Sequence, residues 1–560
     1  MRITNKVMQK NSLSNINTNK KLQDKLNTQM ATEKKINRPS DDPVVAIRAL
    51  RLRTNVSQIT QYYEKNSKDA ESWLQVTEDA LTTVSEVITD LIEQTEKGAN
   101  ENLTSSDRNA ILEALSKLRD EVYATGNADY AGRSIFTGYR TDTTLKYIED
   151  TTKKYSITEQ ITSGDIDTIT YVHSGSLNSV NDANYNKDVA TDGAAADYKD
   201  IIEQDVDSRS IYRIRLAYGD VDGVDQTEVT DADGNTVRAA IPMIKLYNPA
   251  TGEYEEAKVD TDGDGTPESS IAIKTMSLND NPNPYDTASD PENPDYNEYG
   301  AVLIKETGEL LIGDKVYEQL MKQEDNVNTV FDETSLLVTY EKSDWKKDDL
   351  KPEHYFKCED LTDTEEIVTY NAAYIVPGEE VEKQAIEYDI GMNQVIRVNT
   401  TADEVFQHAI GRDVDDLIAA MQEVVDMEET VARLEKMAED TQYTEDELKI
   451  INNQLDAANK ALALLDEKAQ KLFEHGITKM QGHLDTANLA TTNCGTRGMK
   501  LDLIQNRLMS QQTNFENLQS ENENVDVTEV AIQLTSAELT YEAALMATGK
   551  IMQTSLMNYI

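Results

Sequence analysis

The sequence predicts a mainly α-helical protein with a β-rich insert: a long antiparallel helical coiled-coil rod, formed by the N- and C-terminal segments, that carries a large outer β and loop domain. Three observations lead to this prediction. Apolar residues recur at alternating spacings of four and three along both ends of the chain. Nine of the eleven prolines lie between Pro242 and Pro377. Most of the negative charge lies in the same central part.

The first segment, residues 1–41, is polar and basic. Residues 1–53 hold twelve Lys and Arg against four acidic residues, although the whole chain has a formal net charge of -49. We expect residues 1–41 to be poorly ordered, because they are too polar to bury a face by themselves. The segment ends on a helix start signal, Arg38-Pro39-Ser40-Asp41-Asp42-Pro43: Pro39 keeps Arg38 out of the helix, Asp42 is a good N-cap acceptor, and Pro43 suits the first helical position.

Residues 42–144 are predicted to form the N-terminal helices of the rod. Fourteen positions follow the four-three spacing, and twelve of them are apolar: Val45, Ala49, Leu52, Val56, Ile59, Tyr63, Asn66, Ala70, Trp73, Thr77, Ala80, Val84, Val87 and Leu91. A spacing sustained over this length predicts a helix that packs against another helix. We therefore interpret Tyr63 and Trp73 as packing residues rather than ligand contacts.

Residues 497–560 are predicted to supply the partner helices. The same spacing runs through Leu501, Ile504, Leu508, Phe515, Leu518 and Val525, slips by one residue near Asp526, and resumes at Val530, Leu534, Ala537, Tyr541, Ala544, Thr548 and Ile551. Such a slip changes the supercoil locally and leaves the helix otherwise intact. The two ends of the chain must then lie together.

Between them, residues 145–400 are predicted to form an acidic β-rich insert, and residues 401–496 a helical segment. Alternating apolar residues over 211–218, and short apolar runs on both sides of Gly308, are typical of strands. A final hairpin is expected over 386–398. Two capping boxes, Thr401 with Glu404 and Thr444 with Glu447, then indicate helix starts. The insert has the properties of a separately folding outer unit that could be removed without loss of assembly.

Charge and composition exclude several classes of partner. Residues 145–496 carry -45 of the net charge, and such a surface repels nucleic acid and anionic lipid. No apolar run is long enough to span a membrane. We therefore expect neither nucleic acid nor membrane as a partner. Only Cys358 and Cys494 occur, so a disulfide framework is not expected, and a single bridge between them stays open.

Catalytic motifs are absent from the sequence. The five histidines show no short ligand spacing, and His475 and His483 are interpreted as surface residues rather than a metal pair. No nucleophile elbow, P-loop or dinucleotide-binding glycine motif occurs. The sequence predicts that the protein is not an enzyme and needs no cofactor.

One segment has the pattern of a weak calcium loop. Asp260, Asp262 and Asp264 occupy its first, third and fifth positions, but Ile271 stands where a bidentate glutamate is required. Asp and Gly are also the usual residues of exposed turns, so a plain turn is the leading interpretation. The similar residues 231–235 are interpreted as a hairpin turn.

Three stretches of this chain resemble the flagellin family. Residues 36–53, from Ile36 through the Arg38 to Pro43 motif, resemble its N-terminal signature, and residues 127–138 are similar to the turn after its second helix. Residues 498–560, which end on Leu556-Met557-Asn558-Tyr559-Ile560, match its returning helices. The resemblance covers roughly residues 1–145 and 385–560. Within the family, the opening residues, the Arg38 to Pro43 motif and the ending are most similar to the branch found at the junction between hook and filament.

The resemblance implies a structural component of the bacterial flagellum. It implies self-assembly into a ring or tube through the terminal helices, with an inner wall formed by both ends. A preceding hook-associated protein, flagellin subunits and an export chaperone are the implied partners. Extracellular location, after export without cleavage by the flagellar type III apparatus, is also implied.

Two alternatives to the junction adapter stay open. One is the filament flagellin itself, although flagellins commonly carry arginines where Asp90 and Ile92 stand here. The other is an adhesive or ligand-binding surface protein that acts through its insert.

Overall fold

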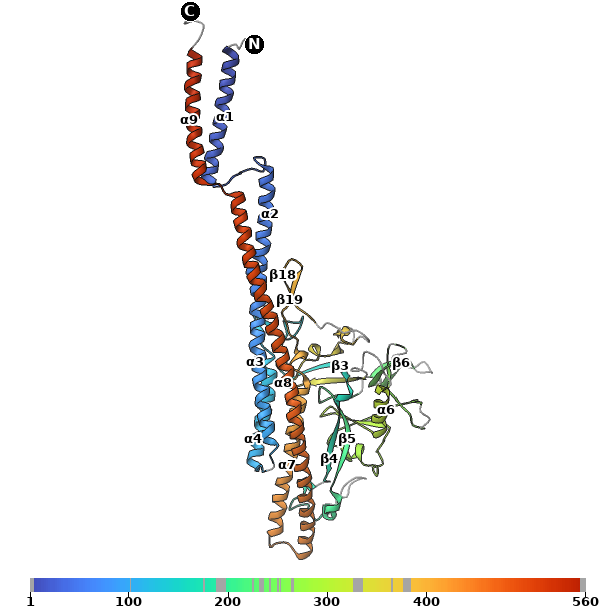
Figure 1. Ribbon diagram of the computed structural model, residues 1–560. Coiled ribbons are helices and arrows are strands. Elements are labelled where there is room, and N and C mark those ends of the chain that lie inside the picture. The colour runs from blue at the N-terminus through green and yellow to red at the C-terminus, as the bar shows by residue number, and fades with distance from the viewer. Residues whose placement is uncertain are drawn as a thin grey trace, which may run out of the picture. The chain divides into compact units, whose positions relative to one another are not determined.

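The computed structural model describes residues 5–100, 102–174, 177–187, 198–223, 226–230, 236–240, 243–248, 251, 253–262, 266–325, 336–363, 366–375 and 384–553. The chain forms two compact units, and Figure 1 labels their elements. Unit 1 comprises residues 1–72, 387–397 and 497–560. Unit 2 comprises residues 73–386 and 398–496.

Helices form both ends of the described chain and also occur between them. They are α1 (Asn5–Thr32), α2 (Pro43–Thr60), a π-helical turn η1 (Gln61–Asn66), α3 (Ser67–Gly98), α4 (Ser105–Thr125), α5 (Pro284–Ser289), α6 (Asp314–Asp325), α7 (His408–Glu439), α8 (Glu445–Glu523) and α9 (Val527–Gln553). As predicted, Asp42 caps α2: its Oδ1 accepts hydrogen bonds from the backbone N–H groups of Val44 at 3.0 Å and Val45 at 3.2 Å.

Two larger sheets occupy unit 2. One has the order β12-β13-β14-β5-β4, and the other has the order β17-β16-β3-β15-β8-β9. Their strands are β3 (Thr151–Ile161), β4 (Ile166–His173), β5 (Asp207–Arg215), β8 (Ile244–Asn248), β9 (Glu253–Glu256), β12 (Ala272–Met276), β13 (Gly300–Ile304), β14 (Glu309–Ile312), β15 (Leu336–Trp345), β16 (Lys357–Asp360) and β17 (Val368–Tyr370).

Four short two-stranded pairs complete the β structure. They are β1 (Asp129–Tyr130) with β2 (Arg133–Ser134), β6 (Gln226–Thr230) with β7 (Thr236–Ala240), β10 (Lys258–Val259) with β11 (Ser269–Ser270), and β18 (Glu387–Gly391) with β19 (Gln394–Arg397). The predicted hairpin with Gly308 at its turn and the predicted hairpin over 386–398 are confirmed. Gly308 has φ +66°, and a Cβ there would lie 2.0 Å from the carbonyl oxygen of Tyr218.

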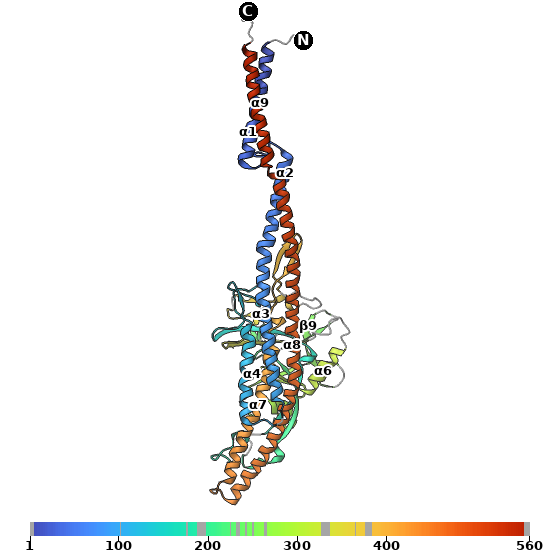
Figure 2. The same cartoon turned by 60° about the vertical axis from the view of Figure 1, so that its left-hand side comes forward.

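In unit 1, α1 and α9 lie side by side and antiparallel (Figures 1 and 2). They bury Leu26 against Val530 and Ala537. Within residues 1–41, which the sequence alone predicts to be poorly ordered, Asn5–Thr32 form helix α1. Apolar side chains on α9 supply the partner that the polar segment lacks by itself.

The slip near Asp526 is a break between helices, which corrects the expected continuous helix. Helix α8 ends at Glu523, and α9 begins at Val527. The break lies beside the link between α1 and α2: the Lys35 N–H donates to the Glu523 carbonyl at 2.8 Å, and the Val525 N–H donates to the Glu33 carbonyl at 3.0 Å. These bonds satisfy backbone groups that the helix ends leave open.

The N- and C-terminal helices run antiparallel within each unit, as predicted. In unit 1, Asn522 donates to the Val45 carbonyl at 3.2 Å, and Gln505 donates to the Ser67 carbonyl at 3.3 Å. In unit 2, the Cys494 thiol donates to the Leu74 carbonyl at 3.4 Å. All fourteen predicted positions from Val45 to Leu91 are buried or half-buried. Pairing of the two ends therefore follows the predicted apolar face.

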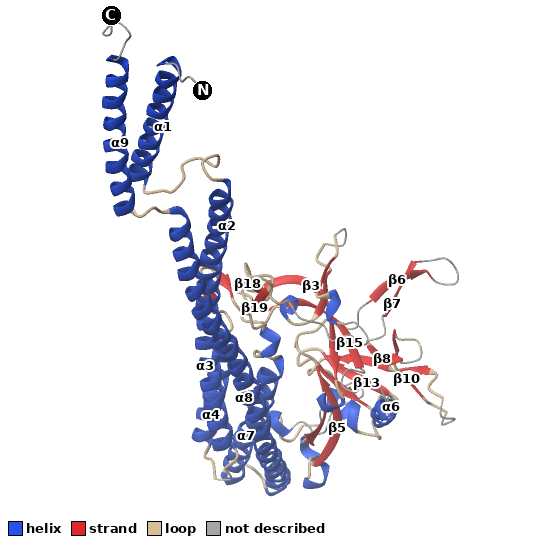
Figure 3. Cartoon of the chain, turned by 45° about the horizontal axis from the view of Figure 1, so that its top comes forward, coloured by secondary structure: helices blue, strands red, loops and turns tan. Residues whose placement is uncertain are grey.

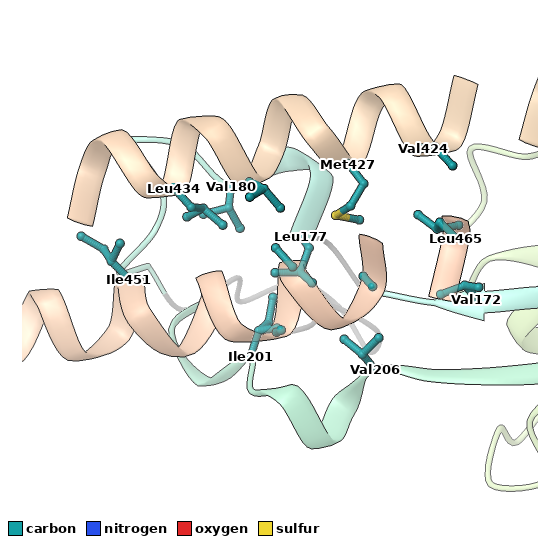
Figure 4. Packing of buried hydrophobic residues seen from close by; sticks show 14 of the residues in the cluster. Val172, Leu177, Val180, Ile201, Val206, Val424, Met427, Leu434, Ile451 and Leu465 are labelled. Atoms are coloured by element: carbon teal, nitrogen blue, oxygen red, sulfur yellow. The ribbon is translucent and has the colours of Figure 1, made fainter. Parts of the chain in front are cut away.

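The β-rich part of unit 2 packs directly on α7 and α8. Figure 3 shows β3, β5 and β15 on one side of these helices. Described residues between Val172 and Val206 cover the α7–α8 hairpin with one apolar cluster, shown in Figure 4, which includes Val172, Leu177, Val180, Ile201, Val206, Val424, Met427, Leu434, Ile451 and Leu465. The expected separate outer domain therefore differs from the structure, because strands and helices share one core.

Two further features bear on the predictions. Cys358 and Cys494 are both buried and not bonded to each other. Among the helices of the described residues, none has both the length and the apolar character needed to cross a membrane.

Candidate assembly surface

The helices of unit 1 expose many large apolar side chains. On α1 and α9 these are Val7, Met8, Leu13, Leu22, Met30, Val527, Ile532, Leu539, Leu545 and Met546. By contrast, the buried core between the two helices consists of Leu26, Val530 and Ala537, with Val525 and Leu534 packed against it. A helix pair that exposes more apolar residues than it buries is typical of an interaction surface.

A second apolar stripe lies on α2, away from its buried positions. Val44, Ile47 and Leu50 recur every three residues and are 59%, 55% and 63% exposed. Residues three apart lie on neighbouring parts of a helix surface, so these side chains form one strip. The buried face of the same helix is made by Ala46, Ala49 and Ile59. Helix α2 is therefore apolar on two sides, and only one of them is covered within unit 1.

A charged cluster lies at the break between α8 and α9 and helps to hold it in place. The Arg53 guanidinium donates two hydrogen bonds, both 2.6 Å long, to the Glu523 carboxylate, and the Lys34 ammonium lies 3.6 Å from that carboxylate. The bonds from Arg53 hold the pKa of Glu523 below its usual value, although burial opposes this. Two parallel hydrogen bonds to a buried carboxylate restrict the geometry at this break between α8 and α9 more strictly than a single hydrogen bond does.

The exposed loop before α2 is ordered by its own acidic residue. The Asp41 carboxylate accepts hydrogen bonds from the backbone N–H groups of Arg38 at 3.0 Å and Asn37 at 3.3 Å. Arg38, Pro39 and Pro43 are exposed. The loop thus presents a fixed basic and proline-containing surface beside the α2 stripe.

The predicted assembly residues fall into two groups. Ile59, Trp73, Val84 and Leu508 are buried, and Leu52, Val56, Tyr63, Leu534 and Tyr541 are half-buried, so both sets pack within the chain. The side chain of Ile551 lies outside the described residues. The loop residues Arg38 to Pro43 are the predicted positions that remain available to a neighbour.

Sequence reasoning missed the stripe of Val44, Ile47 and Leu50 and the role of Glu523. The stripe could have been found as a second three-residue periodicity beside the first. Glu523 carries no sequence signal of its own, because its function depends on Arg53, which lies 470 positions away.

The calcium-loop pattern is described only in part. Asp260 and Asp262 place carboxylate oxygens within 4.8 Å of an oxygen of Glu268, and the three residues flank the β10–β11 pair. Glu268 also accepts a hydrogen bond from the Thr261 hydroxyl at 2.8 Å, as a turn residue does. Asp264 and residues 231–235 lie outside the described residues.

Comparison with known proteins finds a similarity in the N-terminal helices. Residues 3–141 match the bacterial flagellin N-terminal helical region. Over 143 residues, 25% of this chain, the sequence is 31% identical to flagellar hook-associated protein 3 of Salmonella typhimurium. It is 26% identical over 127 residues to a flagellin of Clostridium tyrobutyricum, a match that covers 23% of this chain and 33% of that protein.

These matches are partial. The chain spans 45% of the length of the matched hook-associated protein 3. Among solved structures, the flagellar junction protein of Legionella pneumophila is 11% identical, with 86% of this chain and all of that chain covered, at a TM-score of 0.26. Because this score is low, the likeness to known proteins depends on the sequence of residues 3–141.

Proposed function

We propose that this chain, whose residues 3–141 form a flagellin-type N-terminal helical region, is a structural adapter at the junction between the flagellar hook and the filament. The observation that carries the proposal is the 31% identity, over 143 residues, to flagellar hook-associated protein 3. The uncovered apolar stripes on α1, α2 and α9 support it, because an assembled subunit needs surfaces that only neighbouring subunits cover.

Symmetry explains how such a subunit acts. A head-to-tail contact between identical subunits generates either a closed ring or an open helix. An adapter then needs one face for copies of itself and two different end faces. We propose a preceding hook-associated protein on one side and flagellin subunits on the other. Export by the flagellar type III apparatus, with a chaperone, brings the subunit to an extracellular site on the flagellum.

Filament flagellin is the second candidate, because the chain is also 26% identical over 127 residues to the Clostridium flagellin. Flagellins commonly carry arginines at the positions of Asp90 and Ile92, and this chain does not. An adapter stops propagating after one layer, whereas flagellin repeats one contact many times. The two functions therefore differ in the extent of self-assembly: one layer of subunits for an adapter, and a long filament for flagellin.

Deletion of the gene in the source bacterium distinguishes the two functions. For an adapter, electron microscopy should show hooks without filaments, and immunoblots should detect flagellin as soluble monomer in the medium. A plasmid copy of the gene should restore filaments. Disappearance of the main filament antigen, or growth of purified protein into micrometre-long tubes from filament seeds, would assign the chain as flagellin instead.

A further inference from the structure

The start of α7 is enclosed by aromatic rings from the β-rich part of unit 2. The His408 ring lies with its centroid 4.7 Å from that of Tyr218, 4.5 Å from that of Tyr355 and 5.1 Å from that of Phe356. The first two rings meet His408 edge to face. Tyr218 follows β5, and Tyr355 and Phe356 precede β16, so both large sheets contribute to this contact.

His408 is poorly suited to carry charge in this position. Its Nε2 atom is fully enclosed and has no hydrogen-bond partner among the described residues. Burial, with the nearby Arg412 guanidinium, lowers the pKa of His408 well below its ordinary value. An imidazolium has two N–H donors, and the enclosed one would lack an acceptor. Protonation is therefore tied to separation of the rings.

The other charged groups around this contact are balanced. A cavity of about 310 Å³ beside His408 is lined by Arg215 of β5, Lys357 of β16, Arg412 of α7, Glu159 of β3, Asp165 before β4 and Asp403 before α7. Glu159 accepts a hydrogen bond from the Ala217 N–H at 2.8 Å and another from the Tyr340 hydroxyl, and burial raises its pKa. The lining of this cavity named here therefore holds three basic and three acidic side chains.

One turn further along α7, the helix makes an ionic contact with α8. Asp413 accepts hydrogen bonds from Lys479 at 2.9 Å and from His483 at 2.8 Å, both on α8. Burial opposes ionisation of Asp413, but these bonds outweigh it and lower its pKa. This ionic contact therefore weakens only below the ordinary carboxylate range of about pH 4, whereas an unfolded histidine titrates near 6.5.

We propose that His408 and the rings of Tyr218, Tyr355 and Phe356 form an acid-sensitive latch that holds the β-rich part of unit 2 on the start of α7. At neutral pH the rings enclose an uncharged imidazole. When the contact opens, His408 is hydrated and takes up a proton, so acid favours the open form. Because one proton is bound on opening, the opening equilibrium changes about tenfold for each pH unit below about 6.5.

His354 lies close by but is not part of the proposed latch. Burial, with Lys351 and Arg140, lowers the pKa of His354 to about 3, and its Nε2 lies 3.3 Å from the Thr143 hydroxyl. These partners belong to the β-rich part and the loop before it, not to α7. Protonation of His354 loosens that loop, whereas protonation of His408 releases α7. The two effects fall on different backbone segments.

Hydrogen-deuterium exchange of the full chain at pH 7.5, 6.0 and 5.0, with labelling times scaled for the intrinsic exchange rate, tests the latch. Protection of residues 408–416 should fall roughly 30-fold between pH 7.5 and 5.0. His408→Phe keeps a ring and cannot titrate, so its protection there should be independent of pH. His475→Gln, at an exposed position on α8, should behave like the native chain.

Unchanged protection in the native chain, or the same fall in His408→Phe, would overturn the proposal. If His408→Phe does not fold at pH 7.5, the native chain with ¹³C-labelled histidine decides by NMR. The His408 Cε1 signal should then shift only as protection is lost, whereas a midpoint near pH 6.5 with protection retained contradicts the latch.

Discussion

Arg213 on β5 forms a buried ion pair with Asp416 on α7, with 2.7 Å between Nη2 and Oδ2, although the two residues are 203 positions apart. The Arg213 side chain is 6% exposed and also donates a 2.5 Å hydrogen bond to Glu309 on β14. Arg215, two residues along the same strand, reaches the same Asp416 carboxylate. One aspartate on the helix thus pairs with two arginines of the sheet, and Glu309 supplies a second carboxylate to Arg213.

Removal of the charge at Asp416 should destabilise unit 2. Asp416→Asn removes the carboxylate that pairs with Arg215 and one of the carboxylates that pair with Arg213. Breaking such a buried pair costs about 3–5 kcal/mol of unfolding free energy. Urea unfolding followed by circular dichroism measures the loss. Glu435→Gln, at an exposed position on the same helix, should change stability by less than about 0.5 kcal/mol. Equal effects of the two variants would contradict a buried network.

Removal of the insert should unfold the helices that carry it. The sequence alone favours a deletable unit between residues 145 and 400. In the structure, α7 and α8 share an apolar cluster with residues 172–206 and place Asp416 against β5. A chain in which residues 145 and 400 are joined by a Gly-Ser linker should therefore lose the cooperative melting of unit 2. Native-like melting and normal motility of this chain would restore the sequence-based interpretation.

The pair of His173, at the end of β4, with Asp286 should make the free energy of unfolding depend on pH. His173 Nδ1 lies 2.7 Å from Asp286 Oδ1, and this bond raises the pKa of His173, although burial opposes it. A raised folded pKa means that the stabilisation is complete below the unfolded value near 6.5 and is lost as pH rises through the folded pKa.

His173→Asn should therefore lower the melting temperature at pH 5.5 more than at pH 8.5. Asp286→Asn removes the partner and should show the same dependence on pH. Melting curves of the native chain and both variants across this range measure the effect. A difference that grows toward pH 8.5 would show that burial of the neutral imidazole dominates instead.

The α2 stripe should be needed for assembly and not for folding. Leu50 is 63% exposed, so Leu50→Asp should leave the melting temperature of the purified monomer nearly unchanged. In an apolar contact between subunits the new carboxylate would be buried without a partner. Cells that produce this variant should shed flagellin, whereas Ser57→Asp, at an exposed polar position of α2, should support filaments. Full motility of Leu50→Asp cells would remove the stripe from the assembly surface.

Long-range contacts explain where prediction from the sequence failed. The spacing of apolar residues runs unbroken through Tyr63 and Asn66, yet the structure has a π-helical turn over Gln61–Asn66. There the Asn66 amide donates to the Asp389 carbonyl of the β18–β19 hairpin at 2.7 Å. A contact with a segment 323 positions away cannot be deduced from the local spacing. The break between α8 and α9 has a similar origin, since its backbone groups bond to residues 33–35.

The sequence by itself determined which face of α2 and α3 is buried, because helical periodicity and capping are local: the positions from Val45 to Leu91, the Asp42 cap and the hairpin around Gly308 all follow from neighbouring residues. Only the tertiary structure decided that the β-rich part shares a core with α7 and α8. That attachment depends on which charges of β5 meet which turn of α7, and the register between distant segments is set by packing and pairing of the whole unit.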